Sequence, residues 1–431
     1  MFKKILFLLL FNINSLYTKS HDISVIGGGY SGLTSAITLA QKGHNISIYE
    51  KNNFLGGRSY TKTIDNYEYS MGPSWYIMDN LYEDVFNYFN YSSNNFYELY
   101  KPNFSYSIFL NNNTLHIPNN YNVLYKNIIN NYDQNNTLKQ YFNDASLFEN
   151  ISYPILWSKQ DDIYDLFNVF YRFDYNTLKQ IFNIKLDNYI SHIESHTSNN
   201  IIKLLLKWPV IFVGNNPKYS SNIYSLLNNN IYKNGVFIPY NIIKNTNNTN
   251  IRKFDNNLPI KSLIKIANKL KIKFYLNHSV NKYYYQNNKI KKICFNYTNN
   301  NNNDTFKNKD KYIYYCKKTD GVISSIDYQY HEQNILAKKY HTYSKQYWDK
   351  RTFSPNVLIY YLSTNKPINN LNIHNYFFTT DIDRYLENVF ENNITPNIPI
   401  FYINNLDNKI INNNYSSDNN YTSYNNYSSD N

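Results

Sequence analysis

Hydrophobic residues near the start of the chain follow the period of a strand, then of a helix, then of a strand again. Residues 22–26 (DISVI) form a short apolar run rich in β-branched side chains, which predicts a buried parallel strand. Apolar residues recur with helical spacing over 33–40, and Gly43 is a typical helix stop. With a second strand expected over 45–49, the pattern predicts a strand-helix-strand unit.

The turn between the first strand and the helix is rich in glycine. Gly27, Gly29 and Gly32 form a G-x-G-x-x-G sequence, which allows a tight turn, close approach to a diphosphate and close packing of helix on strand. The helix amino terminus favours negative charge. Glu50 ends the second strand 23 residues after Gly27, where a carboxylate accepts hydrogen bonds from adenosine ribose hydroxyls. This order predicts dinucleotide binding and leaves FAD and NAD both open.

The net charge adds little to this prediction. The 431 residues include 43 basic and 31 acidic side chains, a net charge of +12. The excess is lysine scattered through a sequence rich in Asn, Tyr and Ile, and no recognised nucleic-acid-binding motif accompanies it. We therefore expect no nucleic-acid partner.

The cysteine and histidine residues suggest neither a disulfide framework nor a metal site. Cys294 and Cys316 lie 22 positions apart without a CxxC pair, so redox chemistry is expected to come from a bound cofactor. His192 and His196 have the spacing of one helix face, and we interpret them as polar side chains on the protein surface and not as metal ligands.

The first twenty residues have the layout of a targeting signal. Lys3 and Lys4 precede an apolar run over 5–11 that is too short to span a bilayer. The sequence thus predicts targeting to the secretory pathway or to an organelle. The alternative is an unstructured amino-terminal extension. We do not expect an integral membrane protein, because no other stretch approaches about 18 uninterrupted apolar residues.

Residues 50–61 (EKNNFLGGRSYT) resemble the motif that follows the ribose acid in FAD-dependent amine oxidases and carotenoid desaturases. Gly56 and Gly57 would let the backbone close on the flavin diphosphate, and Arg58 would supply a fork-shaped cation beside it. The resemblance therefore implies FAD as the cofactor.

Residues 70–78 (SMGPSWYIM) are similar to the next conserved stretch of the phytoene desaturases, bacterial-type carotenoid enzymes. There, the turn that corresponds to Gly72 and Pro73 lies under the flavin, and aromatic residues lead to the substrate region. The resemblance continues loosely over 22–403, with a helix expected over 261–270, a strand over 273–280 and a closing strand that begins at Gly321. It implies that the backbone of Val280 faces the adenine ring.

Two departures from the family pattern bear on activity. Residues 240–242 (YNI), which begin with Tyr240, stand where relatives carry a glycine pair. No Gly-Asp motif follows the region near Tyr402. From residue 404 the chain is polar and of low complexity, which predicts a disordered tail. The sequence thus resembles a shortened desaturase, and an inactive relative is one alternative.

The expected fold class is α/β, with a discontinuous Rossmann-like FAD-binding domain and a mixed α+β substrate domain. The resemblance implies desaturation of a carotenoid precursor such as phytoene, a lipophilic polyene, with FAD accepting hydride and with peripheral membrane association. A polyene isomerase or saturase and an amine oxidase are alternatives, and no catalytic residue is predicted. The expected segments are 1–20 (targeting), 21–75 and 255–330 (FAD domain), 76–254 and 331–403 (substrate domain) and 404–431 (tail).

Overall fold

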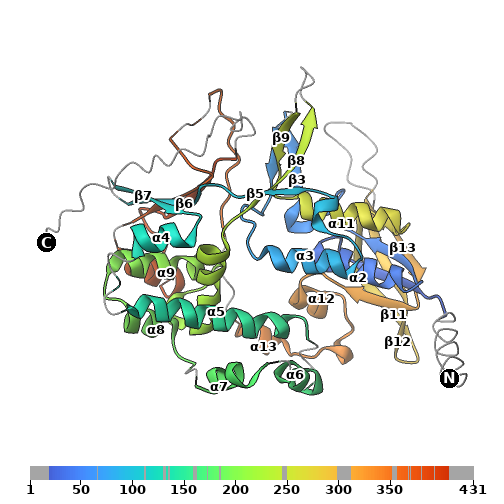
Figure 1. Cartoon of the computed structure of the whole chain (residues 1–431). Helices are drawn as coiled ribbons and strands as arrows, with labels where there is room; N and C mark the ends of the chain where they lie inside the picture. The colour runs from blue at the N-terminus through green and yellow to red at the C-terminus, as the bar shows by residue number, and fades with distance from the viewer. Residues whose placement is uncertain are drawn as a thin grey trace, which may run out of the picture.

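A computed structural model gives the architecture (Figure 1). It describes residues 19–406 except for 66, 111–112, 130–132, 134–135, 159–162, 172, 184–185, 245–249, 299–311, 352–356, 367, 369, 380 and 393. Nearly all of the predicted targeting segment and tail therefore lies outside the described residues. Among the helices of the described part, none is long and apolar enough to cross a membrane.

One half of the molecule, the parallel-sheet half, is built on a four-stranded sheet in the order β10-β2-β1-β14. All three strand pairs are parallel, as the strand-helix-strand pattern predicts. The two outer strands come from a distant part of the chain, so the sheet is discontinuous in sequence. The elements are β1 (Asp22–Ile26), α2 (Tyr30–Gln41), β2 (Asn45–Tyr49), α11 (Leu258–Lys269), β10 (Lys273–Tyr275) and β14 (Gly321–Ser324).

A second, antiparallel sheet in the order β11-β12-β13 continues directly from β10. The sequence suggested one strand over 273–280, but Asn277 adopts a left-handed φ of 58° and turns the chain into the new sheet. Our expectation for the cysteines was wrong, because Cys294 and Cys316 face each other across two strands and form a disulfide. The strands are β11 (His278–Gln286), β12 (Lys289–Thr298) and β13 (Tyr312–Lys318).

The other half, the helical half, packs helices against a sheet in the order β16-β15-β6-β7 (Figure 1). Its core is a large cluster rich in aromatic side chains, including Tyr106, Tyr141 and Trp208. Its elements are β6 (Phe104–Leu110), β7 (Asn113–Pro118), α4 (Tyr121–Asn127), α5 (Thr137–Leu156), α6 (Ile163–Phe170), α7 (Tyr175–Asn183), α8 (Tyr189–His196), α9 (Asn200–Phe212), β15 (His374–Phe378), α14 (Ile382–Phe390) and β16 (Phe401–Asn404).

Smaller elements connect the two halves. The remaining sheets are β3-β4 and β5-β8-β9, and residues 222–228 form short turns of helix. The elements are β3 (Thr61–Ile64), β4 (Tyr67–Ser70), α3 (Asp79–Tyr88), β5 (Glu98–Tyr100), η7 (Asn222–Ser225), α10 (Leu226–Asn228), β8 (Ile238–Lys244), β9 (Asn250–Phe254), α12 (Tyr328–Asn334) and α13 (Lys345–Asp349).

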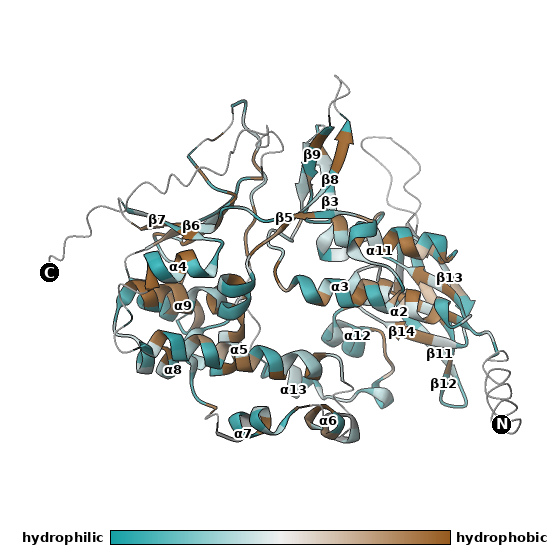
Figure 2. Ribbon diagram, in the orientation of Figure 1, coloured by the Kyte–Doolittle hydropathy of each residue, from teal (hydrophilic) through white to brown (hydrophobic). Residues whose placement is uncertain are grey.

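The chain passes from one core to the other at two consecutive residues. Trp75 is buried in the cluster of the helical half, and Tyr76 is buried in the cluster that contains α2 and α11. Residues 76–97 then pack with the parallel-sheet half, although our division assigned them to the substrate domain. The domain division itself stays a prediction. Figure 2 shows hydrophobic residues together with hydrophilic ones along the helices of both halves, as expected of helices that bury one face.

The fold class is confirmed. The structure is an α/β protein with a parallel, Rossmann-like sheet and a mixed second half.

Candidate dinucleotide site

The predicted glycine and acid residues gather at the carboxyl edge of the parallel sheet. Gly27 follows β1 and Glu50 follows β2, and parallel strands bring such ends together. The backbone amide of Glu50 donates to the carbonyl of Tyr275 at the end of β10 (2.9 Å). The hydroxyl of Ser325, just after β14, donates to the carbonyl of Ile26 (2.8 Å). All four strands therefore contribute to this edge.

Two of the three glycines are required by the protein itself. Gly27 has a φ of +96°, which L side chains rarely adopt. A Cβ atom at Gly32 would lie 2.0 Å from the carbonyl oxygen of Gly27, so any side chain there would push α2 away from β1. These positions are explained by the tight turn and the close helix packing that the motif predicts.

Gly29 is different, because the described protein leaves room for a side chain there. Its backbone is extended, and a Cβ atom would have only the Cα atom of Gly57 within 4 Å apart from its chain neighbours, at 4.0 Å. Gly29 also begins α2 without a side-chain cap, and the first turn carries no acidic residue. An open helix amino terminus beside a glycine that packing does not demand suits a bound anion.

The carboxylate of Glu50 is buried and held firmly. One oxygen accepts a hydrogen bond from the amide of Gly28 (2.9 Å). The other accepts from the backbone amide (2.9 Å) and the side-chain amide (2.8 Å) of Asn52. A carboxylate offers about four acceptor positions, so the orientation of Glu50 is fixed and roughly one position is left for a hydroxyl group.

The loop with Gly56, Gly57 and Arg58 folds onto the glycine turn. The amide of Gly56 donates to the carbonyl of Gly28 (2.8 Å), and both Gly56 and Gly57 have positive φ angles. The side chain of Arg58 is exposed, and within the described ranges it has no ion-pair partner. Its charge is available to an anion at this turn.

Gly72 and Pro73 lie behind the same loop. A Cβ atom at Gly72 would come within 2.3 Å of the carbonyl oxygen of Arg58, so this glycine allows two backbone segments to touch. The hydroxyl of Ser70 donates to the carbonyl of Pro73 (2.8 Å) and closes the turn.

Val280 lies on β11, whose first residue is hydrogen-bonded to Glu50. The amide of His278 donates to the carbonyl of Glu50 (2.8 Å), which brings the start of β11 to the site. The side chain of Val280 is 5% exposed and packs with Ile26 and Tyr49. The contact of its backbone with adenine, which the family resemblance implies, stays a prediction.

Comparisons with known proteins agree with this geometry. Residues 25–92 match the family of NAD(P)-binding Rossmann-like domains. The chain is 21% identical over 385 residues to carotenoid 3,4-desaturase of Haloarcula japonica, covering 89% of this chain and 71% of that protein. It is 25% identical over 213 residues to a 4,4'-diapophytoene desaturase (4,4'-diaponeurosporene-forming) of Staphylococcus aureus, covering 48% of this chain and 40% of that protein.

The chain is similar to these members of the phytoene desaturase-like family. Its parallel sheet and glycine turn are those of a Rossmann-like domain. Among solved structures, a CLA-producing fatty acid isomerase from P. acnes aligns with a TM-score of 0.44 at 11% identity, over 78% of this chain and 64% of that one.

Sequence reasoning missed two residues of this site. Asn52 orients the ribose acid through two hydrogen bonds, and Ser325 closes the glycine turn from β14. Ser324, in register with Ile26, has a buried hydroxyl without a partner among the described atoms. The signal was a polar residue two positions after Glu50 and a serine pair at the end of a predicted strand.

An aromatic cluster follows the Gly72–Pro73 turn. Trp75 lies 4.6 Å from His374 and 5.3 Å from Phe212 between ring centroids, and Trp208 lies 4.0 Å from Tyr376. Burial lowers the pKa of His374 to about 3. Buried polar atoms without partners are rare, yet within the described structure four occur in this cluster: Trp75 Nε1, Trp208 Nε1, His374 Nε2 and the Tyr376 hydroxyl.

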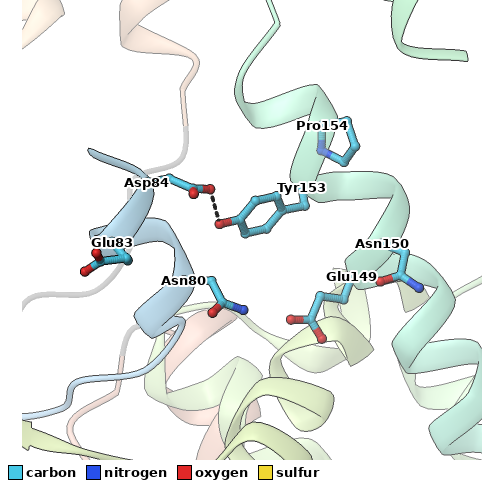
Figure 3. Close-up of a pocket in the computed structure, with 7 residues that line it drawn as sticks. All are labelled: Asn80, Glu83, Asp84, Glu149, Asn150, Tyr153 and Pro154. Atoms are coloured by element: carbon cyan, nitrogen blue, oxygen red, sulfur yellow. Dashed lines mark hydrogen bonds between the residues drawn. The ribbon is translucent and has the colours of Figure 1, made fainter. Parts of the chain in front are cut away.

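A cavity of about 480 Å³ lies elsewhere, between α3 and α5 (Figure 3). Its lining carries Glu83, Asp84 and Glu149, and the hydroxyl of Tyr153 donates to Asp84 (2.6 Å). None of the residues predicted to bind the dinucleotide lines it. An acidic wall does not suit an oily polyene, so we do not assign the substrate to this cavity.

Proposed function

We propose that the chain is an FAD-dependent oxidoreductase that desaturates a long polyene such as phytoene. The observation that carries the proposal is the cradle at Gly29, where packing leaves space between the open amino terminus of α2 and Gly57. The names of the two desaturase relatives support a carotenoid-like substrate.

The residues of the cradle fit the ADP part of FAD. Glu50 would accept hydrogen bonds from the ribose hydroxyls, and the helix amino terminus with Gly29 and Gly57 would hold the diphosphate. Arg58 would pair with the same phosphates. The backbone of Val280 would face the adenine, and the turn at Gly72 and Pro73 would lie under the flavin.

The flavin supplies hydride acceptance when it is bound, and the protein groups position the two reactants. Trp75 continues directly from the turn assigned to the flavin, and its ring cluster offers an aromatic wall to a conjugated chain. We propose that the substrate passes beside this cluster. The domain division stated from the sequence belongs to the same proposal.

Peripheral membrane association is proposed for α6 and α7 and the residues beside them. Tyr164, Phe167, Tyr171 and Tyr175 are 78%, 58%, 87% and 78% exposed, which places four large aromatic rings on one surface region. Aromatic side chains favour the membrane interface, and an oily substrate would come from a bilayer. We expect the full chain to sediment with phosphatidylcholine vesicles, and replacement of Tyr164, Phe167 and Tyr171 by serine to abolish this. Equal sedimentation of wild type and variant would contradict it.

The test of function is a visible absorption spectrum followed by a conversion assay. The full chain, purified after expression with added riboflavin, is expected to show a flavin band that denaturation releases as FAD. Incubated with phytoene in liposomes and an electron acceptor, it is expected to give products with longer conjugation on chromatography. A folded protein that takes up no FAD would contradict the enzyme proposal, and a flavoprotein that leaves phytoene unchanged would contradict the substrate.

A further inference from the structure

The helical half contains a group of potential metal ligands that lies outside the dinucleotide site. Asp144 on α5 and the pair His192 and His196 on α8 each offer one ligand atom, and these atoms all lie within 4.8 Å of one another. The two histidines are separated by one helical turn and therefore share a face of α8. The third ligand comes from a neighbouring helix, which is why the sequence alone did not reveal the group.

Hydrogen bonds to the rest of the protein orient the two more accessible side chains. His196 Nδ1 lies 2.8 Å from the carbonyl oxygen of His192, and because a carbonyl only accepts, Nδ1 carries the proton. This tautomer leaves the lone pair of His196 on Nε2, the arrangement that is common for metal-binding histidines. The side-chain amide of Gln140 donates to one oxygen of Asp144 (2.8 Å) and leaves the other oxygen for a ligand.

His192 supplies an independent reason to expect a ligand. Its Nε2 atom is buried and has no hydrogen-bond partner among the described residues. A buried polar atom without a partner costs about 1–3 kcal/mol, which a metal bond would recover. The ring of Tyr141 lies 5.1 Å from that of His192 and 5.6 Å from that of His196 and shields the group on one side.

The local charge also suits a cation. His196 is in the last turn of α8, where the helix dipole is negative. The carboxylate of Asp144 adds a full negative charge. Two imidazoles and one carboxylate form a donor set of borderline softness, which suits Zn²⁺ and its neighbours better than Mg²⁺ or Ca²⁺.

We propose that Asp144, His192 and His196 bind one divalent transition-metal ion of the Zn²⁺ class, which links α5 to α8. Ligand atoms around a tetrahedral Zn²⁺ lie about 3.3 Å apart, given bonds of about 2.0 Å. The present separations, all within 4.8 Å, therefore have to shorten by up to about 1.5 Å when the ion binds. Three protein ligands leave a fourth position for water.

The test is metal titration of the full chain after treatment with a chelator. Wild type is expected to bind one Zn²⁺ per chain in calorimetry, and Co²⁺ in its place is expected to give the visible absorption bands of a tetrahedral site. His196→Gln, His192→Gln and Asp144→Asn should each weaken binding at least about tenfold. His341→Gln, which lies outside the group, should bind as wild type does.

A second measurement separates lost binding from lost folding. Asp144→Asn keeps the size and the contact with Gln140, so its far-ultraviolet circular dichroism should match that of wild type, whereas Zn²⁺ should raise the unfolding temperature of wild type alone. Absence of stoichiometric binding to wild type, or binding equal in wild type and all three variants, would overturn the proposal.

Discussion

The structures of the two halves of the molecule depend on different kinds of sequence feature. In the parallel-sheet half, single positions are dictated by the backbone: Gly27 by its φ of +96° and Gly32 by a carbonyl 2.0 Å from a would-be Cβ atom. In the helical half, the core is a network of large rings in which Tyr106 and Tyr232, or Tyr141 and Asn228, hydrogen-bond in the interior. One half is specified by short motifs and the other by packing between distant segments.

The largest expected effect comes from filling the closest contact of the parallel-sheet half. Gly32→Ala should destabilise the protein by at least about 3 kcal/mol, because the added methyl group overlaps the Gly27 carbonyl. Gly321→Ala is the matched control, since its Cβ atom would meet only Ile23 Cγ1 at 3.9 Å. Urea unfolding of both variants measures the difference. Similar urea midpoints would contradict the claim that backbone contacts require glycine at position 32 and not at position 321.

The disulfide should contribute nearly as much. Cys294 and Cys316 close a loop with a sequence separation of 22, which corresponds to about 3 kcal/mol of loop entropy. Replacing both with alanine should lower the free energy of unfolding in urea by that amount, and a reducing agent should do the same to wild type. A wild-type protein whose midpoint is insensitive to the reducing agent would show that the bridge does not form.

In the helical half, His374 should make stability depend on pH. Its pKa of about 3 in the folded protein lies below the usual 6.5 of an unfolded histidine. The unfolded chain therefore takes up a proton first as the pH falls, and stability is lost from about pH 6.5 downward. We expect a loss of about 2 kcal/mol between pH 7 and 5 from this group. His374→Asn should remove that part of the slope, and parallel pH profiles of the two proteins would contradict the assignment.

The smallest effect is expected at the ribose acid. Glu50→Gln replaces one acceptor oxygen with an NH₂ group that faces donors, at a cost of about 1–2 kcal/mol. Glu194→Gln is the control, because that side chain is 51% exposed and should change stability by less than about 0.5 kcal/mol. Thermal unfolding compares the two, and a Glu50→Gln protein as stable as the control would mean that the carboxylate is not held as described.

The sequence predicted the parallel-sheet half well because its signals are local. The strand over 22–26, the helix that follows, the strand over 45–49 and the helix near 261–270 all form, and the fold class is confirmed. The break at Asn277 was missed, since one residue with a left-handed φ separates two strands that follow each other after only two residues. The disulfide was missed because pairing depends on strand register, which a single sequence does not reveal.

The candidate site divides in the same way. The residues of the glycine turn and Glu50 were predicted from spacing, and the structure brings them to one sheet edge. Asn52 and Ser325 act through hydrogen bonds formed only in the folded chain, and the cluster around Trp75 depends on strands more than 250 residues apart in the sequence. Their roles could not be predicted because no local pattern marks them.

The most direct test of the central claim is an FAD titration of wild type and Gly29→Ala, in which flavin fluorescence measures binding. Because a Cβ atom at Gly29 meets no clash, the variant should lose at most about 1 kcal/mol of stability, the cost of a poorer helix cap. If the cradle holds the FAD diphosphate, the same methyl group should weaken FAD binding at least about tenfold, or about 1.4 kcal/mol. Equal FAD affinity in the two proteins, or no binding by either, would contradict the account.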